Sequence, residues 1–359
     1  MPATKRFGSD VIVGVSINNT TGITGKAYEL SDLLRAGIEA EAMGFDAVWV
    51  HDAPLGRRTT AAYDPVNVLS LIAGATRHVG LATGILTPQL RNPVMLAQQW
   101  ATLFEGSEGR AILGVGTGAG TGTLVRREFE ALSALRHDSN LDPQRLYEAR
   151  SKLFDETMDI MRRLWSEDKF SYHGELFKFS EVTLGGARPS VMPPVLIAAG
   201  IYFSKEPGAP LHHGWQEKYA GKHIFGPYKR IVDYGDGWFG VHVPPTEYIE
   251  KWERVKKYAA EKGRTQNLVK AFNCFVNVDD DPQKAWQSVK DQLSDFHGPP
   301  VGDDMVDRWA VSGTPTDVAQ KLQGYIDVGV SVFQLVIGSP DQFGQMKRLA
   351  EQVLPLLRR

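Results

Sequence analysis

Short runs of apolar and β-branched residues recur along the chain, and almost every run is followed by a stretch with the periodicity of an amphipathic helix. Continuous apolar runs are typical of strands buried on both faces, and their alternation with helices predicts a parallel sheet. The expected strands are VIVGVSI (11–17), DAVWV (46–50), HVGLATGIL (78–86), RAILGVG (110–116), PPVLIAAG (193–200), GDGWFGV (235–241), KAFNCFVNV (270–278) and VSVFQLVIG (330–338). The expected helices cover residues 30–43, 65–77, 93–105, 143–165, 246–262, 283–295, 315–328 and 342–357.

Eight strand–helix units of this kind favour an α/β fold of the (β/α)₈ TIM-barrel type over an open, doubly wound sheet. We expect residues 1–359 to form one barrel domain. Two connections exceed ordinary loop length: residues 117–142 follow the fourth strand, and residues 201–233 follow the fifth. Both leave the carboxyl ends of strands, where barrel enzymes build their active sites. The second connection carries several glycines and aromatic residues, so we expect it to act as a mobile lid.

Charge and cysteine content narrow the range of partners. The 40 lysine and arginine residues nearly balance the 42 aspartate and glutamate residues, which leaves no basic field for nucleic acid or an anionic membrane. The expected partners are therefore a small-molecule substrate and further copies of the chain in a homo-oligomer. Cys274 is the sole cysteine, so no intrachain disulfide can form. The N-terminus MPATKRFGSD has no apolar core of signal-peptide length, and no apolar run reaches the roughly 18 residues of a membrane span, so we expect a cytoplasmic protein.

The strongest local motif is RAILGVGTGAGTG (110–122), in which a short apolar run ends in alternating glycines. The spacing Gly114-x-Gly116-x-x-Ala119 matches a dinucleotide-binding fingerprint, but its strand is the fourth of the chain and no helix is expected directly after it. The motif also lacks the Lys-Ser/Thr pair of a phosphate-binding loop. A flexible loop is one interpretation. We favour a strand whose backbone ends close to a flat or anionic ligand, because glycine has no Cβ. Gly84, inside GLATGILTPQLRNP (80–93), indicates a bulge or a second close approach.

Six segments, taken in order, resemble the bacterial luciferase-like superfamily of flavin- and deazaflavin-dependent barrel enzymes. They are GFDAVWVHD (44–52), GLATGILTPQLRNPVMLAQQWATL (80–103), GRAILGVGTG (109–118), PPVLIAAG (193–200), YGDGWFG (234–240) and SGTPTDVAQKL (312–322). Each segment is loose alone, but the ordered set is specific and spans most of the chain. The resemblance implies an oxidoreductase that binds a dissociable flavin-type cofactor.

The resemblance also implies cofactor-binding positions at the ends of three strands. The family's third strand ends in a bulge, often with a non-proline cis peptide, behind the isoalloxazine-type ring, and Thr83, Gly84 and Ile85 occupy that place. The end of the fourth strand lies beside the ring or ribityl chain, and the end of the fifth lies near the cofactor tail and phosphate. The corresponding residues are Gly116, Thr117 and Gly118 after the fourth strand and Ala199, Gly200 and Ile201 after the fifth.

Three side chains are candidates for the catalytic chemistry. His51 and Asp52 follow the second strand and are expected to face the site, and His213 lies in the long segment after the fifth strand. His213 and its neighbour His212 diverge because they are adjacent, so they make a poor metal-binding pair. The sequence contains no His-x-x-x-His motif or acidic cluster that favours a metal centre, and we expect none.

Two departures from the family pattern leave the chemistry open. Many relatives have a histidine where this chain has Ala53, and the sugar-phosphate dehydrogenase branch has a glutamate where it has Ala119. We favour a monooxygenase that uses reduced flavin mononucleotide (FMN) and oxygen on a small organic substrate, with a separate flavin reductase as a partner. The alternative is a reductase or dehydrogenase that transfers a hydride with the deazaflavin coenzyme F420. A non-catalytic flavin-binding relative is a further interpretation, and a metal-dependent barrel hydrolase lacks the ligands it would need.

Overall fold

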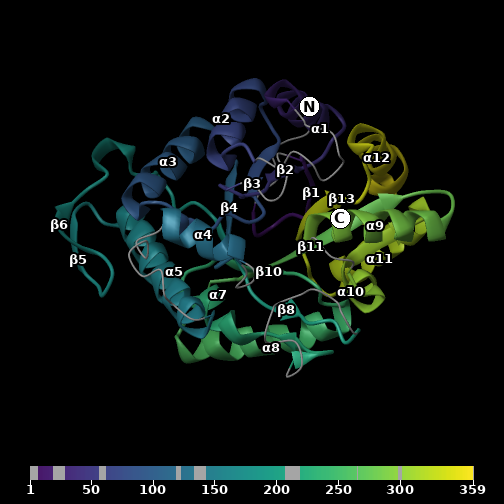
Figure 1. Cartoon of the computed structure of the whole chain (residues 1–359). Coiled ribbons are helices and arrows are strands. Elements are labelled where there is room, and N and C mark those ends of the chain that lie inside the picture. Colours follow the sequence, from purple (N-terminus) through teal and green to yellow (C-terminus); the bar gives the residue numbers. More distant parts are fainter. Residues whose placement is uncertain are drawn as a thin grey trace.

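The computed structural model describes residues 7–18, 29–55, 62–118, 123–132, 143–206, 219–264, 266–297 and 301–358. Within these residues, eight parallel strands close into a barrel, which is seen nearly end-on in Figure 1. The strands are β1 (Ile12–Ser16), β2 (Ala47–Val50), β3 (Gly80–Thr83), β4 (Ala111–Val115), β7 (Val195–Ala198), β10 (Gly237–Gly240), β11 (Val269–Val278) and β13 (Val332–Ile337). They follow one another around the barrel in chain order, and β13 pairs with β1 to close it. The (β/α)₈ barrel expected from the apolar runs is confirmed.

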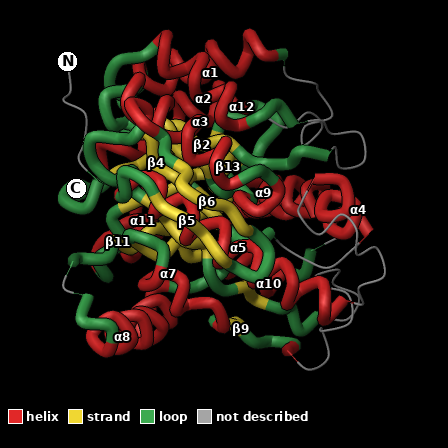
Figure 2. The backbone as a smooth tube through the Cα atoms, turned by 90° about the vertical axis from the view of Figure 1, so that its left-hand side faces the viewer, coloured by secondary structure: helices red, strands yellow, loops and turns green. Residues whose placement is uncertain are grey.

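Helices cover the outside of the barrel (Figures 1 and 2). They include α1 (Leu30–Ala42), α2 (Pro65–Ala75), α3 (Pro93–Gly106), α5 (Pro143–Ser166), α8 (Pro245–Glu261), α9 (Pro282–His297) and α11 (Pro315–Asp327). Proline begins all of these helices except α1, because its fixed φ suits the first helical turn. Asp64 and Asn92 cap α2 and α3 by accepting hydrogen bonds from backbone N–H groups. None of the described helices is both long and apolar enough to cross a membrane.

Apolar side chains fill the inside of the barrel as well as the layer between strands and helices. Inside, Trp49 stacks on Phe239 with ring centroids 5.2 Å apart and an interplanar angle of 14°. Other strands contribute Ile12, Ala47, Ala82, Ile112, Leu196, Val269, Ala271 and Val332 to the same cluster. The inside is therefore a packed core, which leaves the carboxyl ends of the strands as the place for a ligand.

Several short elements have no counterpart among the expected runs. They are α4 (Thr123–Leu132), β5 (Phe170–His173), β6 (Lys178–Val182), α10 (Asp303–Trp309) and β12 (Ala310–Gly313). The strand β12 pairs with the second half of β11, whereas β10 pairs with the first half. β5 and β6 form an antiparallel hairpin that lies outside the barrel, near α5 (Figures 1 and 2). Because α4 lies within residues 117–142, this long connection contains a helix.

The final helix is shorter than its periodicity predicts. We expected one helix over 342–357, but α12 covers Gln342–Arg348 and is followed by a π-helical turn at Leu349–Val353 and a 3₁₀ turn at Leu354–Leu356. Pro355 lies in the last turn and has no backbone N–H to donate. An α-helical hydrogen-bond pattern therefore cannot continue through it.

The segment 201–233 has structured ends. β8 (Ile201–Tyr202) and β9 (His223–Ile224) form a short antiparallel pair. The segment closes with α7 (Lys229–Asp233), which packs against α8. Residues 207–218 lie outside the described residues, so the expected lid motion stays a prediction.

Candidate active site

The carboxyl ends of β3 and β4 form a continuous stretch of paired backbone. The Gly84–Ile85 peptide bond, directly after β3, is cis, and it stands where the family resemblance implies such a bond. Beside it, the Thr83 hydroxyl donates to the Gly114 carbonyl at 2.8 Å and accepts from the Gly114 N–H at 3.1 Å. The N–H of Leu86 donates to the same carbonyl at 2.8 Å. Pairing with β4 therefore resumes directly after the cis bond, and the backbone here is held on both sides.

Glycine at these strand ends is required first by the protein's own packing. A Cβ on Gly84 would collide with the side-chain amide of Gln334, and a Cβ on Gly116 would come within 2.5 Å of Cδ1 of Ile85. These contacts give the two glycines a packing role, and the expected close approach of a ligand to their backbone stays a prediction. The side chain of Ile85 stays partly exposed beside them, so a surface of backbone and small apolar groups remains at the strand ends.

At the end of β7, too, packing inside the protein leaves no room for a side chain on the glycine. Gly200 has a φ of +92°, which favours glycine, and a Cβ there would lie 2.5 Å from the ring of His223. The indole N–H of Trp238 donates to the carbonyl of Ala199 at 2.8 Å and fixes the peptide before this turn. Ile201 then begins β8, where it pairs with β9. The segment Ala199–Ile201, expected to lie near the cofactor tail, is thus held by strand pairing and by the buried indole of Trp238.

Asp52 is part of a buried ion pair. Its side chain is fully buried and binds the guanidinium of Arg91 through both oxygens, at 2.7 and 2.8 Å. Its Oδ2 also accepts the N–H of Thr87 at 2.9 Å. The carboxylate therefore joins the end of β2 to the chain beyond the cis bond, and the catalytic role expected for Asp52 stays a prediction. His51 is half-buried directly after β2, at the carboxyl end of the barrel as expected.

A second arginine holds the end of β4. Arg150, on α5, is 1% exposed, and its Nη2 donates to the carbonyls of Thr117 and Gly118 at 2.5 and 2.6 Å. Nε2 of Gln89 donates to the Thr117 carbonyl as well, at 3.0 Å. With Gly118 at a φ of +76°, these donors fix the orientation of the two peptides. The backbone assigned to the ring or ribityl chain is therefore held from the outer side of the barrel.

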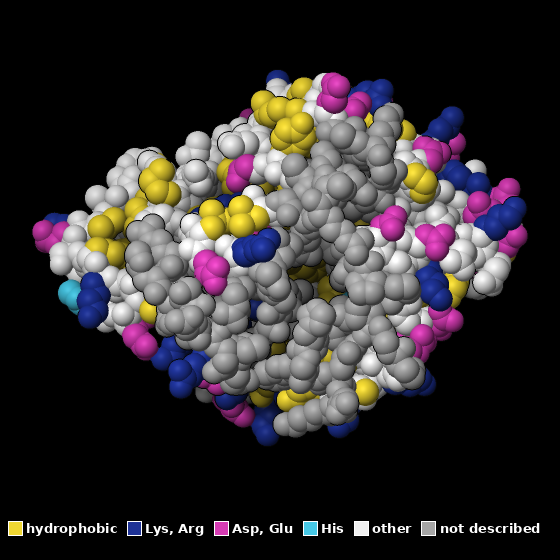
Figure 3. All heavy atoms as spheres, in the orientation of Figure 1, with side chains coloured by type: hydrophobic (Ala, Val, Ile, Leu, Met, Phe, Trp, Pro, Cys, Tyr) yellow, Lys and Arg dark blue, Asp and Glu magenta, His cyan; other side chains and the backbone are white. Residues whose placement is uncertain are grey.

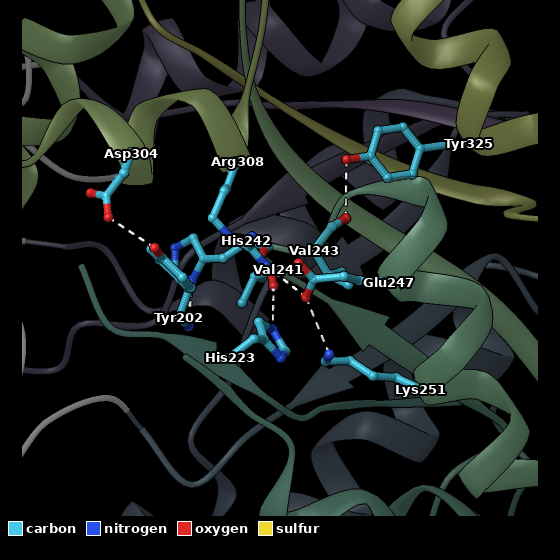
Figure 4. Close-up of polar contacts among 10 residues, drawn as sticks. All are labelled: Tyr202, His223, Val241, His242, Val243, Glu247, Lys251, Asp304, Arg308 and Tyr325. Atoms are coloured by element: carbon cyan, nitrogen blue, oxygen red, sulfur yellow. Dashed lines mark hydrogen bonds and ion pairs between the residues drawn. The ribbon is translucent and has the colours of Figure 1, made fainter. Parts of the chain in front are cut away.

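Two histidines lie near the end of β10 (Figure 4). Nε2 of His223 lies 3.0 Å from the carbonyl oxygen of Val241. Because a carbonyl only accepts, this nitrogen carries the ring proton. Burial lowers the pKa of His223 to about 4, so the ring is neutral at pH 7. His242 has a φ of +53°, and its ring packs edge-to-face against Trp309 with centroids 4.0 Å apart.

A carboxylate anchors the start of the long segment after β7. Asp304, on α10, accepts the hydroxyl of Tyr202 at 2.8 Å (Figure 4). It also accepts the N–H of Lys205 at 2.9 Å and the hydroxyl of Ser204. Burial raises the pKa of Asp304, but these hydrogen bonds outweigh it and hold the pKa below its usual value. Arg308 stacks over the Tyr202 ring at 4.2 Å. The first residues of the segment are thus fixed to α10.

The structure brings together most of the side chains and backbone positions expected from the sequence. The ends of β2, β3, β4 and β7 lie on neighbouring strands, whereas His213 lies outside the described residues.

Sequence reasoning missed Arg91, although it lies within the LTPQLRNP stretch and is a lone cation in a motif with glycine and proline. It also missed Arg150, which has no local signal because its role depends on how α5 packs. Among the described residues, no group of three or more potential metal ligands is present.

Comparisons with known proteins agree with the barrel fold. The family model described as luciferase-like monooxygenase matches residues 11–215. The chain is 30% identical over 348 residues to an F420-dependent glucose-6-phosphate dehydrogenase from Kineococcus radiotolerans, which covers 89% of this chain and 91% of that relative. A solved F420-dependent secondary alcohol dehydrogenase, in complex with an F420–acetone adduct, has a TM-score of 0.75 at 20% identity and covers 98% of this chain and 100% of its own. The oxygenating constituent of 3,6-diketocamphane monooxygenase from Pseudomonas putida, in complex with FMN, has a TM-score of 0.68 at 14% identity and covers 97% and 99%.

Proposed function

The chain belongs to the luciferase-like monooxygenase family, and we propose that it exchanges a hydride between coenzyme F420 and an alcohol or carbonyl group of a small organic substrate. As a member of the family it is an oxidoreductase of the flavin- and F420-dependent class. The observation that carries the proposal is the 30% identity, across most of both chains, to a relative named as F420-dependent. This supports the alternative from the sequence analysis better than the FMN-dependent monooxygenase that we favoured there.

The described residues fit a planar cofactor at the ends of β3, β4 and β7. These ends carry glycines, partly exposed Ile85 and Ala198, and little side-chain bulk. Figure 3 shows a hollow near the centre of this face with hydrophobic side chains visible inside it. When bound, F420 supplies a deazaflavin ring that carries the hydride. Thr83, Gly84 and Ile85 would lie behind that ring, and the residues after β4 and β7 would hold its side chain and tail.

Buried side chains hold this surface from outside the barrel. Asp52 with Arg91 fixes the chain after β3, Arg150 fixes the end of β4, and Trp238 fixes the end of β7. A binding surface fixed in advance costs less conformational entropy when the ligand binds. It also keeps the reacting atoms of the cofactor at a constant depth, which hydride transfer over a short distance requires.

The test begins with equilibrium titrations of F420, FMN and a nicotinamide dinucleotide, each oxidised and reduced. We expect F420 to bind most tightly. Glucose 6-phosphate and 2-propanol are then offered with oxidised F420, and loss of its visible absorbance reports hydride transfer. Oxygen uptake is followed in parallel with reduced FMN. Stoichiometric oxygen uptake with an oxygenated product would overturn the proposal in favour of the monooxygenase. Binding of F420 without turnover of any alcohol or carbonyl compound would favour a non-catalytic relative.

A further inference from the structure

A one-way chain of hydrogen bonds crosses the inside of the barrel, from the end of α10 through β11 and β13 to the end of β1. The indole N–H of Trp309 donates to Oδ1 of Asn273 at 2.8 Å. Nδ2 of Asn273 donates to Oε1 of Gln334 at 2.7 Å, and Nε2 of Gln334 donates to Oγ of Ser16 at 2.7 Å. The four side chains are buried, with Gln334 fully so and Ser16 4% exposed.

The direction of this chain follows from the chemistry of its first member. An indole can only donate, so the oxygen of Asn273 must face Trp309 and its NH₂ group must face Gln334. The same argument fixes the Gln334 amide, whose NH₂ group must face Ser16. The Ser16 oxygen therefore accepts, and its proton is left to donate elsewhere. No described residue accepts that proton.

The position of Ser16 places this donor in the half of the barrel mouth opposite the expected cofactor surface. Ser16 is the last residue of β1, its partner Gln334 lies on β13, and Asn273, which donates to Gln334, lies on β11. Nε2 of Gln334 also lies 3.4 Å from the carbonyl oxygen of Gly84, so the chain reaches the depth of the cis peptide. The cofactor surface uses β3, β4 and β7 instead. What binds beside the cofactor therefore lies over β1, β11 and β13.

We propose that the Ser16 hydroxyl donates a hydrogen bond to the substrate oxygen at the carbon that exchanges the hydride. The inference rests on the proposed function, because it places the substrate beside the cofactor. Ser16 keeps its proton and acts only as a donor. The bond strengthens when a hydride from reduced F420 adds to a carbonyl carbon, because the C=O π electrons move to this oxygen as negative charge. The oxygen then takes the proton that completes the alcohol from water. Ala53 and Ala119, which stand where relatives carry a polar side chain, offer no donor of their own.

The experiment separates the hydrogen bond from shape. Cyclopentanone and methylenecyclopentane have nearly the same shape, but only the ketone has an acceptor oxygen. Each is titrated into the protein with oxidised F420, where the ketone cannot react because both partners are oxidised. Ser16→Ala should raise the Kd of the ketone about 3- to 10-fold, which is the effect of one neutral hydrogen bond, and leave that of the alkene unchanged. Ser16→Thr keeps the hydroxyl and should retain the preference.

Two further variants make the test specific to the direction of the chain. In Gln334→Glu an ionised carboxylate would accept the Ser16 proton, so the preference for the ketone should fall as in Ser16→Ala. Ser107→Ala is the matched control, because Ser107 is 1% exposed and donates to Phe104 before β4, at the amino end of the barrel. It should leave both Kd values unchanged.

The outcomes distinguish this inference from the proposed function. Equal changes for ketone and alkene in Ser16→Ala, no change in either, or no binding of the ketone to a wild-type protein that binds F420, would each overturn the assignment. A weaker Kd for F420 alone in Ser16→Ala would place the hydroxyl against the cofactor and would also overturn it. A wild-type protein that fails to bind F420 contradicts the proposed function instead.

Discussion

Replacing Asp52 by asparagine distinguishes a positioning carboxylate from a catalytic one. The change removes the charge but keeps the size of the side chain, and it leaves the Arg91 guanidinium beside an amide. Removal of one partner from a buried ion pair costs about 3–5 kcal/mol. The lower end of this range applies here, because Arg91 is 17% exposed and keeps a second contact, at 3.2 Å, with Asp64. We therefore expect the free energy of unfolding to fall by about 3 kcal/mol, with a weaker Kd for F420 because the chain beyond the cis bond loses its anchor.

Urea unfolding at pH 7 measures the loss of stability, and fluorescence titration measures the Kd. The control is Lys152→Ala, which breaks a pair with Glu175 that is more than half exposed on both sides and should cost less than about 1 kcal/mol. A double variant in which Arg91 is also replaced by glutamine should lose less than the sum of the two single changes, because no charge is then left buried alone. If Asp52→Asn keeps its stability within about 1 kcal/mol of the wild type and its affinity for F420 but loses turnover, the positioning role is wrong and Asp52 is catalytic.

Three other changes test the rest of the site. Arg150→Gln should raise the Kd of F420 about 5- to 10-fold in an equilibrium titration, because two carbonyls lose a charged donor; an unchanged Kd would contradict the clamp. Burial lowers the folded pKa of His223 to about 4, below the unfolded value of about 6.5. The free energy of unfolding should therefore rise by roughly 3 kcal/mol between these two pH values. Urea unfolding should show this rise for the wild type and not for His223→Asn. Gly84→Ala should cost roughly 1–3 kcal/mol by colliding with Gln334, and a further Gln334→Ala change should recover part of the loss in the same assay.

The barrel itself could be predicted because its signals are local. Each strand is a continuous apolar run, and proline begins six of the helices that cover the barrel. The shorter elements were missed for the opposite reason. β12 is a strand only because the second half of β11 extends beyond β10 and offers an unpaired edge. Nothing in residues 310–313 alone indicates that pairing.

The sequence indicated where the backbone of the candidate site lies along the chain, but it did not indicate which side chains contact that backbone. The place of Gly84 and Ile85 came from a motif, and the cis bond stands there. The partner of Asp52 is Arg91, which lies 39 residues further along the chain. Gln334, which explains why residue 84 must be glycine, lies 250 residues away. Periodicity and short motifs carry no information on such pairs, because the closure of the barrel brings them together.

The two halves of the barrel mouth differ in how they are built, and this difference bears on how substrates change within one fold. On the side proposed for the cofactor the surface is backbone, and the side chains that hold it, such as Arg150 and Trp238, lie behind it. A substitution there acts on stability and cofactor affinity together. On the opposite side the surface ends in side chains, with Ser16 held by Gln334. A substitution of Ser16 can change which groups the site accepts while the backbone of β3, β4 and β7 stays intact, whereas Gln334 also packs against Gly84. Selection for a new substrate should therefore act first on the residues of β1, β11 and β13.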